Sequence, residues 1–314
     1  MHDDFDEEEM FTKNAAIARP VAPMAAPVIP VAPTNPNPLA QYFRAPGLSV
    51  KLPTGGRYLP KGAIEFDTQG QVEVFPMRGA DEVLLKSPDA LMSGLAIERM
   101  IGSCVPALKL PALISAPDLD VLLLAIRAAT FGNTMQLDID CPKCGHDNSF
   151  DCDLPSILAT MTPFPDVLEL RLAPEVIVTF KPHTLDEQTR LLISAYEQNR
   201  STQLLDAEDS DLTEEEKQNI MRKALKTVEH LQHVSLSNAI QYITVPGATV
   251  TDRKYIIEFL ANAANTWLSQ IRDKIEEVNQ LGLDRSVHAK CTKCEHEWTA
   301  QIEFNPATFF AQSS

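Results

Sequence analysis

Two Cys-x-x-Cys pairs are the residues of this chain whose types and spacing are best suited to chemistry. They lie in the segments 141–146 (Cys-Pro-Lys-Cys-Gly-His) and 291–296 (Cys-Thr-Lys-Cys-Glu-His). One tight turn with this spacing presents two thiolates to a metal ion, and a second such turn completes a tetrahedral four-sulfur shell. We therefore predict one zinc ion per chain, with these ligands: Cys141, Cys144, Cys291 and Cys294.

Three alternatives to this site stay open at the level of sequence. The four cysteines could be free thiols, or they could form two disulfides, each within a hairpin. A mixed Cys/His shell is a third alternative, because His146 and His296 each follow the second cysteine of a pair by two positions. Four cysteines already fill a tetrahedron, so we interpret both histidines as turn residues. A closed shell leaves no open position for water or substrate, which predicts a structural and not a catalytic metal.

The remaining cysteines and histidines do not form a motif. Cys104 and Cys152 stand alone, and Cys152 is in phase with the apolar face of its predicted strand, so we predict that both are buried thiols. Isolated histidines of this kind are typical of surface or hydrogen-bonded positions; they are His183, His230, His233 and His288. Phosphate-binding loops, nucleophile elbows and His-Glu-x-x-His pairs are absent from the sequence. We predict no enzyme activity, no catalytic residues and no organic cofactor.

Alternating apolar residues on either side of the cysteines indicate the elements that position them. The first pair follows Met135, Leu137 and Ile139 and precedes Phe150 and Cys152, all at a period of two. The second pair precedes the same pattern, which continues through these residues: Trp298, Ala300, Ile302 and Phe304. A period of two is typical of strands, so both pairs are predicted at the tips of β-hairpins.

Composition and charge exclude several classes of protein. The net charge is −16, and it is still −10 without the six acids of residues 3–9, which opposes binding to nucleic-acid phosphates. A stretch of about eighteen apolar residues, long enough to cross a membrane, is absent, and the first residues are acidic, unlike a signal peptide. We expect a soluble protein made in the cytoplasm, where reduced cysteines favour a metal over disulfides.

The order of local patterns predicts an α+β protein with mixed helices and short antiparallel hairpins. Residues 1–44 form an acidic head and a Pro/Ala-rich arm, for which we predict disorder. Residues 45–155 form an α+β part with the first Cys-x-x-Cys turn, and residues 156–285 form a mostly helical insertion. Residues 286–314 hold the second turn and a tail.

Within these parts, several helices and one further hairpin are predicted. Helices are expected near 80–85 and over 117–131, and a hairpin pairs 168–172 with 177–180. Capping boxes at Thr184 to Glu187 and at Thr213 to Glu216 predict two more helix starts. The longest helix is expected over 251–280, and the acidic segment 206–216 is predicted as a mobile linker.

The two halves of the chain share a weak pattern. A Val-x-Val-x-Pro strand at 72–76 is followed by Asp81-Glu82, and a Val-x-Phe-x-Pro strand at 178–182 is followed by Asp186-Glu187. Each half then continues to a Cys-x-Lys-Cys-x-His segment. Two interpretations stay open, namely a degenerate internal duplication and the coincidence of a common strand–loop–helix pattern.

Several short motifs together resemble a known family. They follow one another in this order: Leu52-Pro53-Thr54-Gly55-Gly56-Arg57-Tyr58, Val72 to Met77, Asp81-Glu82 with Leu84-Leu85, Ser103-Cys104-Val105, Asp120 to Arg127 with Phe131-Gly132, Cys141 to Gly145, and Phe304-Asn305-Pro306 to Phe309-Phe310. In this order they resemble the baseplate hub family of T-even-type contractile phage tails. The Pro-rich arm and the segment 206–216 depart from the family's pattern.

The resemblance implies a structural component of the baseplate hub in the virion, present in several copies. Its partners would be other hub and tail proteins, with the tape measure protein as a further candidate. Two alternatives are a tail-assembly chaperone that is absent from the mature particle and a zinc-ribbon adaptor of nucleic-acid machinery. The aromatic residues near 304–310 either contact a partner or fold back into the protein's own core.

Overall fold

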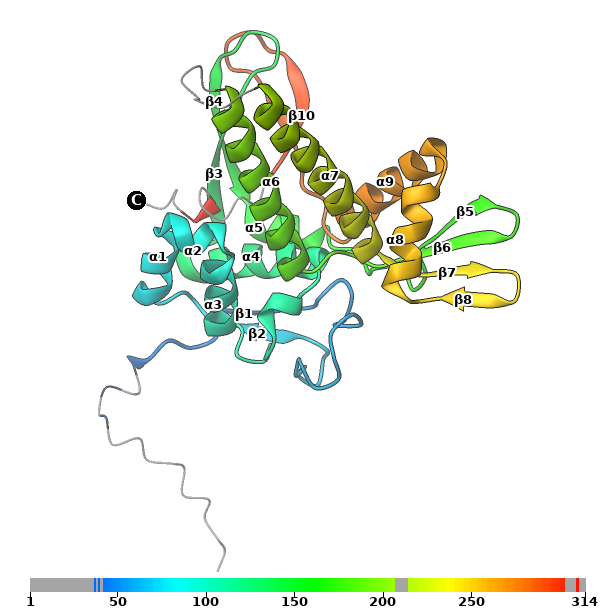
Figure 1. Ribbon diagram of the computed structural model, residues 1–314. Helices are drawn as coiled ribbons and strands as arrows, with labels where there is room; N and C mark the ends of the chain where they lie inside the picture. Colours follow the sequence, from blue (N-terminus) through cyan, green and yellow to red (C-terminus); the bar gives the residue numbers. More distant parts are fainter. Residues whose placement is uncertain (1–36, 38, 40–41, 207–213, 303–308, 311–314) are drawn as a thin grey trace, which may run out of the picture. The chain divides into compact units, whose positions relative to one another are not determined.

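The computed structural model describes residues 37, 39, 42–206, 214–302, 309 and 310. The chain divides into two units, Met1–Phe43 and Arg44–Ser314. In the first unit, the Leu39 amide donates to Asn37 Oδ1 at 2.9 Å. All helices and strands discussed below belong to the second unit (Figure 1). Most of the predicted arm lies outside the described residues.

The first part of the second unit is built around one buried helix, α4 (Ala116–Phe131). Its other elements are the strands β1 (Leu48–Val50) and β2 (Val72–Val74), the helices α1 (Gly79–Leu85), α2 (Pro88–Met92) and α3 (Leu95–Cys104), and the 3-10 turn η2 (Pro111–Leu113). Strands β1 and β2 pair in antiparallel fashion. Helices α1 and α4 confirm the predictions near 80–85 and 117–131, whereas α2 and α3 were not predicted.

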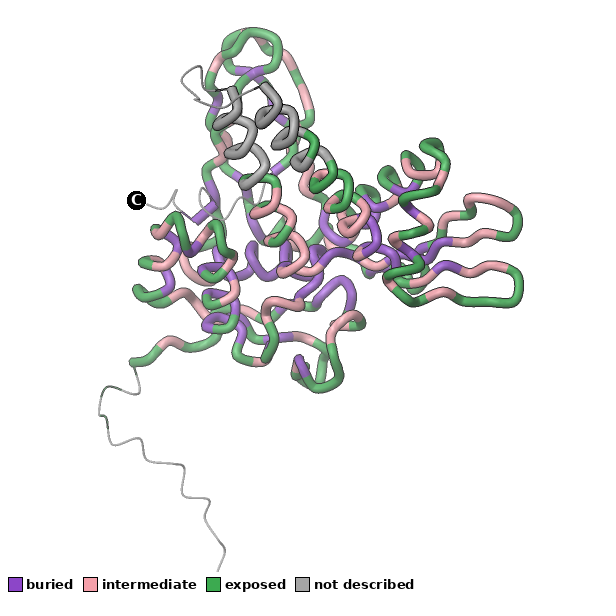
Figure 2. Tube along the Cα trace, in the orientation of Figure 1, coloured by how far each residue is buried: buried purple, intermediate pink, exposed green. Residues whose placement is uncertain are grey.

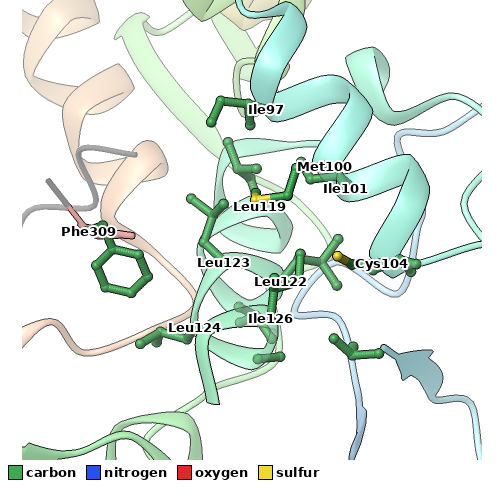
Figure 3. Packing of buried hydrophobic residues seen from close by; sticks show 14 of the residues in the cluster. Ile97, Met100, Ile101, Cys104, Leu119, Leu122, Leu123, Leu124, Ile126 and Phe309 are labelled. Atoms are coloured by element: carbon green, nitrogen blue, oxygen red, sulfur yellow. The ribbon is translucent and has the colours of Figure 1, made fainter. Parts of the chain in front are cut away.

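Helix α4 is buried on every side, because every residue from 116 to 128 is shielded from solvent. Pro117 fits the first turn, where a missing N–H costs nothing, and Gly132 ends the helix. Its apolar residues pack against α3, as Figure 3 shows for Leu119 and Leu122 beside Met100 and Ile101. A helix that is buried on all faces needs neighbours on all of them, so α4 forms the centre of the first core.

Polar side chains of α4 bind three segments that are distant in sequence. The Asp118 carboxylate accepts hydrogen bonds from the amide and hydroxyl of Thr54, and the Asp120 carboxylate accepts one from Arg285. The Arg127 guanidinium donates to the carbonyl of Phe309. Buried polar groups are stable only when they are paired, so these bonds hold the segments against α4.

Two hairpins carry the cysteine pairs. The first consists of β3 (Thr134–Asp140) and β4 (Asp147–Asp153). Two residues separate it from the end of α4, and it leads into α5 (Leu154–Ala159). The second consists of β9 (Ser286–Lys290) and β10 (Glu297–Gln301). The structure therefore confirms that both pairs lie at hairpin tips, and Figure 1 shows these tips together.

The second part of this unit, from β5 to α9, contains a four-stranded antiparallel sheet and four described helices. Its elements are β5 (Glu169–Ala173), β6 (Val176–Phe180), α6 (Leu185–Asp206), α7 (Glu214–Ala239), β7 (Ile240–Val245), β8 (Ala248–Val250), α8 (Arg253–Asn262) and α9 (Asn265–Gln280). The strand order is β5-β6-β7-β8. Buried residues of this sheet, such as Val178 and Ile243, pack with Ile256 and Ile271 of α8 and α9 in a second core. The turns at the sheet's two hairpins are exposed (Figure 2).

The structure confirms the α+β fold class and most of the predicted elements of this part. Hairpin β5–β6 occurs where it was expected, and the capping box at α6 is formed, because Thr184 and Glu187 exchange hydrogen bonds. Thr213, the cap of the other box, lies outside the described residues. Among the described helices, none is long and apolar enough to cross a membrane.

The single long helix predicted over 251–280 is wrong. The chain is extended at Ala263 and Ala264, which separates α8 from α9, and the longest described helix is α7. The flanking residues Asn262 and Asn265 have low helix propensity, and the Asn262 side chain donates to the carbonyl of Glu258 at 2.8 Å. Local side-chain bonding therefore competes with helix continuation at this point.

The C-terminal aromatic residues fold back into the protein. Phe309 and Phe310 are buried in the first core, and their rings meet edge to face with centroids 5.2 Å apart. Figure 3 shows Phe309 beside Leu123 and Leu124 of α4. Of the two alternatives for this segment, burial in the protein's own core is confirmed for these residues, while Phe304 lies outside the described part.

Candidate metal centre

The first turn, residues 141–146, is closed by two backbone hydrogen bonds. The Cys141 amide donates to the His146 carbonyl at 2.9 Å, and the Gly145 amide donates to the Cys141 carbonyl at 2.8 Å. Gly145 has a left-handed φ of 62°, which glycine adopts without steric cost. These bonds turn Cys141 and Cys144 toward the same side. We call this segment the first knuckle.

The second knuckle, residues 291–296, repeats the same geometry. The Cys291 amide donates to the His296 carbonyl at 2.9 Å, and the Glu295 amide donates to the Cys291 carbonyl at 3.0 Å. The amides of Lys293 and Cys294 point at the Cys291 sulfur, at 3.4 and 3.5 Å. Identical spacing thus produces the same turn twice.

The four sulfur atoms of the knuckles form one cluster. Cys141 Sγ lies 3.6 Å from Cys294 Sγ, and Cys144 Sγ lies 3.7 Å from Cys291 Sγ. All four lie within 4.8 Å of one another. In a tetrahedral zinc site with Zn–S bonds of about 2.3 Å, neighbouring sulfurs are about 3.8 Å apart. The donor set and its spacing therefore fit a tetrahedral metal ion.

The surroundings shift the thiol pKa values of two cysteines of the cluster in opposite directions. The Cys144 sulfur faces the other three, and this desolvation, with their hydrogen bonds, raises its pKa to about 12. Burial alone would raise the pKa of Cys291, but the amides of Cys294 and Lys293 and the neighbouring thiols lower it to about 6. A metal ion must displace the remaining protons, so its affinity would depend on pH.

The bases of both hairpins are fixed to the first core. Met135 and Cys152 of the first hairpin are buried there, and the Leu154 amide donates to the Asn133 carbonyl at 2.8 Å. The second hairpin is held by the Arg285–Asp120 pair and by buried Ile302, whose amide donates to the Arg285 carbonyl at 2.9 Å. Helix α4 therefore anchors both halves of the cluster.

A residue that was not predicted joins the two knuckles. Asn148 is 4% exposed, and its side-chain oxygen accepts hydrogen bonds from the amide and the hydroxyl of Thr292, at 2.9 and 3.0 Å. Its side-chain amide donates to the His146 carbonyl at 2.7 Å and lies 3.8 Å from Cys291 Sγ. A polar residue in phase with the apolar Phe150 and Cys152 was the signal for it in the sequence.

The other candidate residues lie apart from the cluster. Cys104 and Cys152 are buried, as predicted, and burial raises the pKa of Cys104 to about 11. His183 is a buried, hydrogen-bonded histidine, with ring nitrogens 3.1 Å from Asn279 Nδ2 and 3.3 Å from the Ser235 carbonyl. The His296 ring stacks on Trp298 with centroids 6.1 Å apart.

The chain matches a known protein family. A family model described as T4 bacteriophage base plate protein matches residues 75–311. The matched segment is more than half of the chain and contains α4, both hairpins and both knuckles. Comparison with curated proteins and with solved structures finds no match.

Proposed function

Because the chain belongs to the T4 bacteriophage base plate protein family, we propose that it is a structural component of the baseplate hub of a contractile phage tail. Its partners are other hub and tail proteins, with the tape measure protein as a further candidate, and it is present in several copies. In this proposal the four clustered cysteines hold one structural zinc ion. The single observation that carries the proposal is the extent of the family match, which includes both knuckles.

The chemistry of the cluster supports a structural metal. Four thiolates fill a tetrahedral shell and leave no position for water or substrate, so the metal would stabilise the fold and not take part in a reaction. Cys141 and Cys144 would bind it from the first hairpin, and Cys291 and Cys294 from the second. The ion would then tie together two hairpins that are distant in sequence.

The charge around the first knuckle argues against the nucleic-acid alternative. The outward face of the β3–β4 hairpin carries five exposed aspartates: Asp138, Asp140, Asp147, Asp151 and Asp153. Asp140 lies opposite Asp147 in the ladder, and their hydrogen bond and like charges raise the pKa of Asp140. An acidic face beside the metal site repels phosphates, which a zinc-ribbon adaptor would have to bind.

Two measurements test the proposal. Mass spectrometry of purified phage particles should detect the chain, and co-expression with the neighbouring tail genes should recover a complex. If co-expression recovers the complex but mass spectrometry does not detect the chain in purified particles, the assembly chaperone is favoured. Binding to duplex DNA with a Kd of about 1 µM or lower at physiological salt, without a tail partner, would favour the adaptor.

A further inference from the structure

The Asn148 side chain is the direct polar link between the two knuckles. It lies on the inward row of β4, and it accepts two hydrogen bonds from Thr292 of the other hairpin. Its amide group donates to the carbonyl of His146, which closes the first knuckle, and approaches the Cys291 sulfur. One buried amide therefore contacts the first turn, the second turn and a sulfur of the cluster.

The two knuckles do not contribute equally to this link. Thr292 follows the first cysteine of the second knuckle, and Pro142 occupies the same position in the first knuckle. Proline has neither a backbone N–H nor a side-chain donor, so the first knuckle cannot donate an equivalent bond to the second. Trp298 occupies the place in β10 that corresponds to Asn148 in β4, four residues after the last cysteine of each knuckle. The two hydrogen bonds from Thr292 to Asn148 therefore have no counterpart in the opposite direction at the equivalent positions.

We propose that Asn148 is a positioning residue that holds the second knuckle against the first, so that the four sulfurs are in place before a metal ion binds. The inference rests on the proposed metal site and extends it to a residue that does not bind the ion. Groups that orient ligands in this way typically change metal affinity 10–100-fold when they are removed. The contribution of Asn148 should therefore appear in metal retention.

Only an amide satisfies all the partners of Asn148. Thr292 offers two donors and needs an acceptor, whereas the His146 carbonyl and the Cys291 sulfur need donors. A carboxylate at this position would keep the acceptor, but it would lose both donors and place a negative charge beside the thiolates. A leucine would remove the acceptor of both Thr292 hydrogen bonds and leave the His146 carbonyl without its Asn148 donor.

The rate of zinc transfer from the loaded full-length chain to a chromogenic chelator tests the proposal. We expect Asn148→Ala to release zinc about 10–100-fold faster than the wild type. Thr292→Pro removes both donors, and the first knuckle shows that this turn tolerates proline there, so it should fold and release zinc faster as well. The double variant should be no faster than the faster single variant, because both substitutions break one link.

A matched control and a metal-free assay separate this inference from the proposed function. Ser149→Ala alters the outward face of the same strand and should leave the release rate unchanged. In the metal-free chain, a mild thiol oxidant should cross-link Cys141 to Cys294, and Asn148→Ala should reduce this product several-fold. Wild-type release rates and wild-type cross-linking in both single variants would overturn the role of Asn148. A wild-type chain that binds no zinc but shows the Asn148-dependent cross-link would overturn the metal site alone.

Discussion

Gly145 and Glu295 occupy the same position in the two knuckles, and both have a left-handed backbone, with φ values of 62° and 56°. Glu295 is the only non-glycine residue with a positive φ in the part of the chain that the structure describes. A left-handed conformation costs a residue with a Cβ about 1–2 kcal/mol. The second knuckle therefore carries a local strain that the first avoids.

Relief of this strain gives the first prediction. Glu295→Gly should raise the free energy of unfolding by about 1 kcal/mol, because glycine adopts the left-handed region without steric cost. Glu295→Ala keeps the Cβ and should bring no such gain, so it serves as the matched control. Denaturant unfolding of the zinc-saturated proteins measures both. Equal stability of the glycine and alanine variants would contradict the prediction.

The metal content of the chain is the second prediction. Elemental analysis should find one zinc ion per chain, and Cys144→Ser or Cys294→Ser should abolish tight binding. The loss should lower stability by several kcal/mol, since structural zinc binding contributes on the order of 10 kcal/mol. Cys152→Ala removes a buried thiol outside the cluster and should keep the metal. Full zinc retention in both serine variants would exclude these cysteines as ligands.

The Asp120–Arg285 pair predicts a specific pH dependence. Burial raises the pKa of Asp120 to about 7, while the charge of Arg285 opposes this shift. A carboxyl group with a raised pKa in the folded chain stabilises the fold below its unfolded value of about 4, and this contribution is lost as pH rises through about 7. Removing Arg285 should therefore lower the free energy of unfolding most when Asp120 is ionised.

Two variants at this pair test the direction of the effect. We expect Arg285→Met to cost about 3 kcal/mol at about pH 8 and clearly less at about pH 5, where a protonated Asp120 needs no counter-charge. Adding Asp120→Asn to this variant should remove most of the difference between the two pH values. Urea unfolding, with each variant compared to the wild type at the same pH, measures these differences in the free energy of unfolding. An equal loss at both pH values would be inconsistent with this account.

The fourth prediction concerns the start of the second unit. Arg44 is its first residue, donates to the carbonyls of Pro76 and Ser103, and lies over the Phe75 ring at 5.5 Å. Removal of residues 1–43 should leave the melting temperature nearly unchanged, because the composition of this segment does not favour a packed core. Arg44→Ala should cost about 1–3 kcal/mol in either background, through its lost hydrogen bonds. Thermal unfolding of the wild type, the truncated chain and Arg44→Ala in both backgrounds tests these two expectations. A large loss on truncation alone would show that the arm supports the core.

The parts of this protein that were predictable from sequence depend on local patterns. Alternation at a period of two located both knuckle hairpins, and the cysteine spacing located the cluster, because one short turn determines where two sulfurs point. Helix α4 was predicted by its apolar residues and by Gly132 at its end. The anchoring of both hairpins to α4 through Asp120 and Ile302 was not predicted, since it joins residues far apart in the chain.

The errors have equally local causes. The break between α8 and α9 depends on two asparagines inside a continuous apolar pattern. Because the apolar residues keep their helical spacing on both sides of the break, periodicity alone does not detect it. Hairpin β7–β8 was overlooked, although Pro246-Gly247 between two β-rich segments is a turn signal. Asn148 was overlooked because polar residues on an apolar face are meaningful only when their partner is known.

The separation of the two knuckles also orders events during synthesis. The first pair is complete at residue 144 and the second at residue 294, which is 150 residues later. At about 5–20 residues per second, the ribosome needs roughly 8 to 30 s to cover this distance. During that interval the nascent chain contains only two of the four cysteines of the proposed metal site, which would bind an ion weakly. The four-sulfur cluster can therefore form only on chains translated through residue 294, and a premature stop upstream would leave a product that cannot assemble it.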